Sequence, residues 1–97
     1  MNFIIKDIRE NIVVLARRIG YQILEAKSHN EYNLVRKLTR DNYPRFHLFV
    51  IQAGDNFHFN LHLDQKEPSY PGTHAHSGEY DGPPVQDEAE RIINLLE

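Results

Sequence analysis

Two histidines stand one residue apart in residues 71–82, whose sequence is PGTHAHSGEYDG. In an extended chain, alternate residues point the same way, with Cα atoms roughly 6.5–7 Å apart. The imidazoles of His74 and His76 can therefore reach one metal ion, to which each nitrogen binds at about 2.0–2.1 Å. Ala75 between them adds no bulk, so this spacing favours a pair of metal ligands.

A hairpin precedes this segment in the sequence. Residues 45–53 and 56–65 are strand-like runs in which apolar side chains alternate with polar ones, and Gly54-Asp55 between them is typical of a two-residue turn. Because side chains alternate across a sheet, one face of this hairpin is apolar. That face is formed by Phe46, Leu48, Val50, Phe57, Phe59, Leu61 and Leu63.

The opposite face of the hairpin carries more histidines. With a turn at Gly54-Asp55, His47 lies opposite His62 and Arg45 opposite Asp64; with the turn shifted by one residue, His47 lies opposite Asp64 instead. In both registers a cluster of imidazoles, carboxylate and guanidinium forms at the open end of the hairpin. The register therefore changes the pairing but not the location of the cluster.

These features predict one polar site, in which loop 70–82 packs across the histidine-bearing face of the 45–65 hairpin. The chain has no cysteine, so a metal there is held by imidazole nitrogens and carboxylate oxygens, as suits zinc or another divalent transition metal. Three such ligands plus water make the open type of zinc site. The expected ligands are His74, His76, His62 and Asp64, and the residues expected to orient a ligand or act as a base are His47, His58, Glu79 and Asp81.

Two alternatives apply to the same residues. One is a metal-free network, in which the imidazoles donate to carbonyl and carboxylate oxygens and hold the loop over Phe49 and Ile51. The other is a metal-free catalytic histidine. The sequence shows no nucleophile–base pair or phosphate-binding loop, so it favours no particular enzymatic reaction.

A different class of function is a non-enzymatic interaction module. The exposed side chains of Phe49 and Ile51, or a basic edge in residues 36–45, would then bind a partner or a second copy in a homodimer. The basic edge is also typical of a strand that is protected by charge against aggregation. It consists of Arg36, Lys37, Arg40 and Arg45.

Length and composition limit the remaining classes. The 97 residues are 40% apolar and 26% charged, which predicts one small globular domain over residues 1–97. The net charge of -3 gives no general attraction to nucleic acid or to an acidic membrane. Charged residues interrupt the apolar N-terminus at once, so it predicts neither a signal peptide nor a membrane span, and we expect a cytoplasmic protein.

The elements that must position the site follow from periodicity. Apolar residues at helical spacing predict a helix from about residue 4 to 19, ended by Gly20. Residues 32–39 predict a further strand, whereas residues 21–26 are short and ambiguous. The C-terminal residues PVQDEAERIINLLE predict a second amphipathic helix.

The expected fold is therefore α+β. It consists of an N-terminal helix, an antiparallel meander of three to four strands, a long ordered loop and a C-terminal helix, arranged as a two-layer sandwich. Both helices are expected to cover the face of the sheet that carries Phe59 and Leu61.

Overall fold

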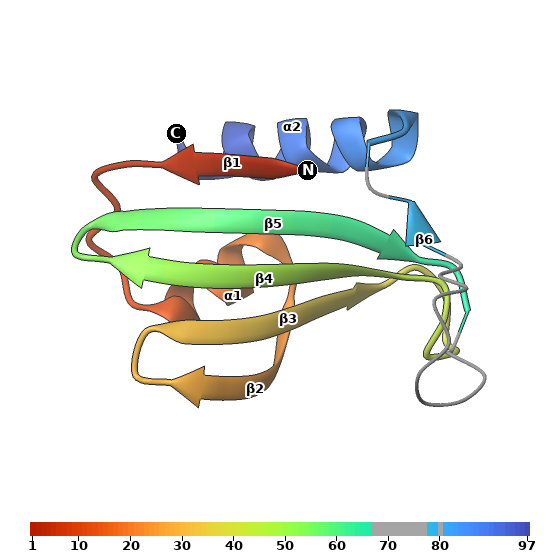
Figure 1. Ribbon diagram of the computed structural model, residues 1–97, viewed down its shortest axis with the longest axis horizontal. Helices are drawn as coiled ribbons and strands as arrows, with labels where there is room; N and C mark the ends of the chain where they lie inside the picture. Colours follow the sequence, from red (N-terminus) through yellow and green to blue (C-terminus); the bar gives the residue numbers. More distant parts are fainter. Residues whose placement is uncertain (67–77, 80) are drawn as a thin grey trace.

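The structure is a computed structural model that describes residues 1–66, 78–79 and 81–97. Among these residues lie two helices and six strands (Figure 1). In chain order they are β1 (Asn2–Ile5), α1 (Ile12–Ile19), β2 (Gln22–Ser28), β3 (Glu31–Lys37), β4 (Arg45–Ala53), β5 (Asn56–Asp64), β6 (Gly78–Glu79) and α2 (Pro83–Leu96).

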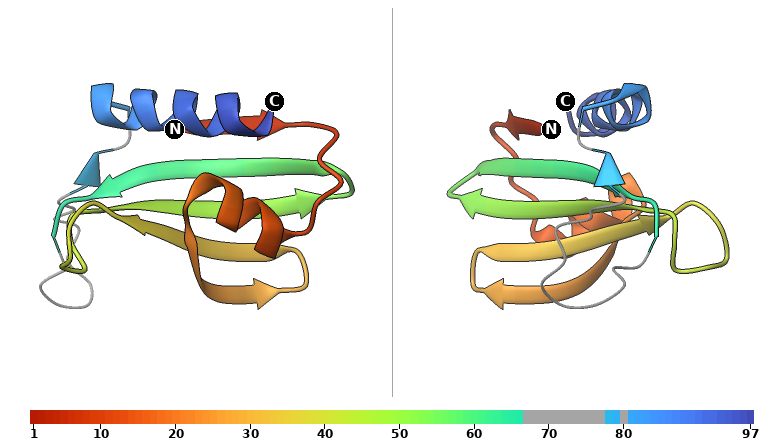
Figure 2. Two further views of the ribbon diagram at one scale, coloured as in Figure 1. Left: turned by 180° about the vertical axis from the view of Figure 1, so that it is seen from behind. Right: turned by 45° about the vertical axis from the view of Figure 1, so that its right-hand side comes forward.

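One antiparallel sheet organises the molecule. Its strands lie in the order β1-β5-β4-β3-β2, and the short β6 also pairs with β5. The predicted meander is confirmed as β2 to β5, and residues 22–28 join it as β2 at one edge. Both helices lie on the same face of the sheet, so the two-layer α+β arrangement is confirmed (Figure 2). Among the described residues no helix covers the other face, which is called the helix-free face below.

The N-terminal helix was expected to begin near residue 4, and this prediction is wrong. The chain instead starts with β1, which pairs with β5 from Asn2↔Asn60 to Ile5↔Phe57. Asp7 has a left-handed backbone, with φ of 62°, which interrupts any helix there. The helix begins only at Ile12. The side chain of Asn11 caps it by accepting a hydrogen bond from the amide of Val14 at 3.0 Å.

The apolar spacing behind that prediction nevertheless identified core residues. Ile5 and Ile8 are 1% and 6% exposed, although neither is helical. The amide of Ile8 donates to the carbonyl of Asp55 at 2.8 Å, which fixes the connection between β1 and α1 on the β4–β5 turn. A strand and a connecting segment therefore bury the side chains that the spacing assigned to a helix.

The hairpin of β4 and β5 has the register that a Gly54-Asp55 turn predicts. Ala53 pairs with Asn56, so the loop has two residues, and Gly54 takes a φ of 62° that suits glycine. The pairing continues through Leu48↔Leu61 to the open end of the hairpin. This register decides which polar side chains face each other on the helix-free face.

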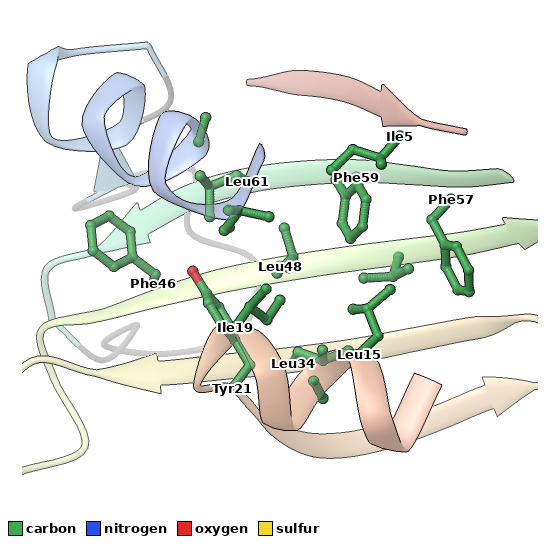
Figure 3. Packing of buried hydrophobic residues seen from close by; sticks show 14 of the residues in the cluster. Ile5, Leu15, Ile19, Tyr21, Leu34, Phe46, Leu48, Phe57, Phe59 and Leu61 are labelled. Carbon is green, nitrogen blue, oxygen red and sulfur yellow. The ribbon is translucent and has the colours of Figure 1, made fainter. Parts of the chain in front are cut away.

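The core lies between the sheet and the two helices (Figure 3). Leu48 and Leu61 from the hairpin are fully buried, and Leu15 of α1 and Ile92 of α2 belong to the same buried cluster. Within the part of the chain that the structure describes, neither helix combines the length and apolar character needed to cross a membrane.

Candidate metal centre

Three side chains from β4 and β5 meet on the helix-free face of the sheet. Nδ1 of His47 lies 3.0 Å from Nε2 of His62, and the same Nε2 atom lies 2.9 Å from Oδ1 of Asp64. Each residue offers one ligand atom, and these atoms all lie within 4.8 Å of one another. Two imidazoles and a carboxylate thus converge on one point.

Strand geometry alone produces this convergence. His62 and Asp64 are two residues apart on β5, so their side chains leave the same face. His47 is the cross-strand partner of His62 in the antiparallel register. Directly opposite residues have Cβ atoms about 4.5–5.5 Å apart, which is close enough for two imidazoles to touch.

Asn33 of β3 determines the proton position on His47. The amide oxygen of Asn33 lies 2.9 Å from Nε2 of His47, and the amide nitrogen of Asn33 donates to Glu25 of β2 at 3.4 Å. Because an amide oxygen only accepts, Nε2 of His47 must donate. In the neutral imidazole, Nδ1 of His47 is then an acceptor that faces His62.

One proton therefore lies at the centre of the cluster. Nε2 of His62 faces two acceptors, Nδ1 of His47 and Oδ1 of Asp64, so it must carry a hydrogen. Removal of this hydrogen leaves three lone pairs directed at the same volume. A divalent cation that takes the place of this hydrogen would find three ligand atoms already in place, and a neutral His62 would then carry its hydrogen on Nδ1.

The spacing of the donor atoms is close to what zinc requires. Tetrahedral coordination at about 2.0–2.1 Å places neighbouring ligand atoms about 3.3 Å apart. The two contacts of His62 are 3.0 and 2.9 Å, so each must open by only a few tenths of an ångström. The ligand atoms of His47 and Asp64 lie within 4.8 Å of each other.

The cluster is partly shielded from water. The side chains of His62 and Asp64 are 18% and 27% exposed. Val35, the β3 partner of His47 on the same face, is only 2% exposed. Such a setting strengthens electrostatic contacts relative to bulk water.

Burial and charge set the protonation states. Burial lowers the pKa of His47, and the neighbouring His62 lowers it further. Burial by itself raises the pKa of Asp64, but the hydrogen bond and the charge of His62 outweigh it, so the pKa of Asp64 lies below its ordinary value. A neutral imidazole and an ionised carboxylate are the forms that bind metals.

The other predicted site residues lie at different places. His74 and His76 lie outside the described residues. The backbone of Glu79 pairs with Leu63 in β6. Asp81 is exposed, and its backbone carbonyl accepts a hydrogen bond from Gln86 at 2.9 Å.

His58 lies on the same strand as His62 but farther from the open end of the hairpin. It is exposed and stands between Ile51 of β4 and Ile4 of β1 in the sheet. Four residues of a strand span about 13 Å, so the structure does not bring His58 to the cluster of His62.

The basic residues are divided between the two faces. Arg36 is opposite Phe46 on the helix-covered face and contacts Glu88 at 3.3 Å, whereas Lys37 and Arg45 are partners on the other face. The guanidinium of Arg45 lies over the ring of Tyr43, 4.5 Å from its centroid. Arg40, in the connection between β3 and β4, is exposed.

A second polar cluster, on the helix side, was not expected from the sequence. Glu88 of α2 is 4% exposed, accepts a hydrogen bond from the hydroxyl of Tyr21 at 2.6 Å, and pairs with Arg91 at 2.7 Å. Arg91 also donates to the carbonyl of Ile19 at the end of α1, at 2.6 Å. This cluster joins α2 to α1 through Arg91, and to β3 through the contact of Arg36 with Glu88. The two guanidinium groups compensate the negative charge of the buried Glu88.

Sequence reasoning also missed Asn33 and Glu25. The alternation of β3 was visible, and it places Asn33 on the same face as Val35. The register between β3 and β4, which brings Asn33 to His47, was the missing information.

Comparisons of the chain with protein-family models, with curated proteins and with solved structures found no match.

Proposed function

We propose that this protein binds one divalent transition metal ion, zinc in the first place, through Nδ1 of His47, Nε2 of His62 and Oδ1 of Asp64. The observation that carries the proposal is the convergence of these three side chains, whose ligand atoms all lie within 4.8 Å of one another. Two imidazoles and one carboxylate form a ligand set found in zinc sites and in non-haem iron sites. Three protein ligands leave at least one position open.

Asn33 supports this role from behind His47. A ligating histidine usually donates its other ring N–H to an oxygen, which fixes its tautomer and orientation. The contact between Nε2 of His47 and Oδ1 of Asn33 provides this interaction, and Glu25 holds the Asn33 amide in turn. His47 therefore moves from an orienting residue, as the sequence suggested, to a proposed ligand.

The proposal extends to His74 and His76, either of which would fill one position, and zinc that expands to five ligands then keeps a position open for a bound molecule. The supporting observation is that Gly78 pairs with Asp64, a proposed ligand, and that His76 precedes Gly78 by only two residues in the sequence. A double His74→Ala, His76→Ala variant separates this extension from the main proposal. It keeps the three atoms of the hairpin and removes only the additional pair.

Isothermal titration of metal-stripped protein with zinc at pH 7 tests the proposal. We expect one site per chain, and His62→Ala should weaken it by more than the roughly 10- to 100-fold that loss of an outer partner causes. His58→Ala is the matched control, because it changes an exposed histidine on the same strand and should leave zinc affinity unchanged.

The pH dependence offers a second readout. Because zinc binds only unprotonated imidazoles, we expect lower zinc affinity at pH 5.5 than at pH 7. Equal loss of zinc affinity in His58→Ala and His62→Ala, or zinc binding that neither variant changes, would contradict the assignment of the ligands.

A further inference from the structure

A hollow of about 560 Å³ lies on the helix-free face, beside the metal centre and over β1, β5 and β4. Ile4 and Ile51 contribute apolar surface to it and are 50% and 36% exposed. The volume falls within the roughly 300–1,000 Å³ typical of small-molecule sites. The side chains from this face that line it are Asn2, Ile4, Phe49, Ile51, His58 and Asn60.

Register connects the hollow to the metal centre. Cross-strand rows follow one another on this face at a spacing of about 7 Å, which is two residues of a strand. The row of His47 and His62 comes directly before the row of Phe49 and Asn60, and Ile51 lies in the row after that. A molecule that lies along the strands can therefore touch the metal and the apolar surface at once.

The charges next to the metal centre favour an anionic end group there, whereas of the carboxylates on this face Glu25 contacts Asn33 and Glu31 pairs with Ile51, two rows away. A divalent cation bound to Asp64 and two neutral imidazoles leaves one net positive charge. Arg45, the partner of Asp64, adds a second, and its Nε atom is buried with no hydrogen-bond partner among the described residues. At the other side of the row, the ammonium of Lys27 lies 5.7 Å from the ring centroid of Phe49.

We infer that this face binds a small carboxylic acid with an apolar body. Its carboxylate takes an open position on the metal, and its body lies in the hollow against Phe49 and Ile51. This inference rests on the proposed metal site. It names the ligand class of that site, because a cationic end and an adjoining apolar hollow complement an amphiphilic anion.

The test uses linear carboxylates as probes. Zinc-loaded protein is titrated calorimetrically with acetate, butanoate, hexanoate and octanoate. We expect the affinity to rise with chain length, by up to about fourfold for each methylene, the factor that full burial gives. Protein stripped of zinc should bind octanoate at least tenfold more weakly.

Variants in the hollow separate the two ends of the ligand. Ile51→Ser, with Ile4→Ser as a second variant, should weaken octanoate binding about three- to tenfold and leave acetate and zinc binding unchanged. Leu24→Ser is the matched control, since Leu24 is a similarly exposed aliphatic residue, 51% exposed, on the edge strand β2.

The outcomes are distinguishable. Zinc binding without any dependence on chain length, or octanoate affinity that is equal with and without zinc, overturns the inference and leaves the metal site intact. Absence of zinc binding overturns both. Self-association in sedimentation that Ile51→Ser abolishes, together with no saturable octanoate binding, assigns the hollow to a second copy of the chain and overturns the inference.

Discussion

Replacement of Asn33 by leucine removes the acceptor behind His47 while keeping a side chain of similar size. In the native protein, Oδ1 of Asn33 lies 2.9 Å from Nε2 of His47, which leaves the Nδ1 lone pair directed at His62. Without this acceptor, the imidazole populates both tautomers and more than one ring orientation. We expect weaker zinc binding, although no ligand has been removed.

The magnitude follows from the position of Asn33. Loss of an outer partner typically costs about 10- to 100-fold in metal affinity, which corresponds to about 1.4–2.7 kcal/mol. The bond that holds Asn33 itself, from its amide nitrogen to Glu25, is long at 3.4 Å. We therefore expect a loss near the lower limit, about tenfold. The metal-free protein should lose only about 1 kcal/mol of stability, the contribution of one neutral hydrogen bond.

Zinc titration by calorimetry and urea denaturation of the metal-free variant measure the two effects separately. Asn33→Asp retains an acceptor oxygen, so it should bind zinc about tenfold more tightly than Asn33→Leu does. Asn60→Leu, one row away on the same face, is the control and should not change zinc affinity. Wild-type zinc affinity in Asn33→Leu would refute the argument that Asn33 orients the ligand.

Further predictions concern the stability that Tyr21, His47 and Asn11 contribute. Tyr21→Phe removes the 2.6 Å hydrogen bond to the buried carboxylate of Glu88, and we expect urea denaturation at pH 7 to show a loss of about 1.5–3 kcal/mol. In the wild type, burial and next the charge of Glu88 raise the pKa of Tyr21, so stability should fall as the pH rises above about 10, and Tyr21→Phe should lack this part of the decline. In metal-free protein, burial and next His62 lower the pKa of His47, so stability should fall as the pH drops below about 6.5, and His47→Gln should reduce the slope of urea midpoints between pH 7.5 and 5.5. Asn11→Ala removes the cap of α1 and should cost about 1 kcal/mol in the same assay.

Each of these predictions has a contrary outcome. A Tyr21→Phe protein as stable as the wild type would mean that the contact with Glu88 contributes nothing net. Equal urea midpoints at pH 7.5 and 5.5 in the metal-free wild type would contradict a neutral, buried His47. An Asn11→Ala protein that loses no stability would show that water replaces the cap at no cost.

The sequence predicted the hairpin and the part of the site that depends on it. Alternation along β5 and the first half of β4 assigns their faces, which places the cluster at the open end of the hairpin. The sequence left two turns open, and the structure decides for the turn at Gly54-Asp55, which pairs His47 with His62.

The features that sequence patterns did not predict depend on pairing between strands that are far apart in the sequence. The spacing of Ile5, Ile8 and Ile12 fits a helix, and only the partner strand β5 and the left-handed Asp7 make residues 2–5 a strand. The contribution of Asn33 depends on how β3 pairs with β4 across a connection of seven residues. Such a long connection does not set a register, so sequence patterns could not place Asn33 beside His47.

Glu88 illustrates the same limit in a helix. An acidic residue in an amphipathic helix is ordinarily exposed. The burial of Glu88 depends on Tyr21 and on Arg91, which meet it only when the helix packs on the sheet. The charge pattern of the helix alone therefore does not reveal that Glu88 is buried.

Crystals grown with zinc, measured on both sides of the zinc absorption edge, test the metal site most directly. We predict one anomalous peak per chain at about 2.0–2.1 Å from Nδ1 of His47, Nε2 of His62 and Oδ1 of Asp64. A map with no peak between these three atoms, or with its only peak beside another histidine such as His58, would contradict the account.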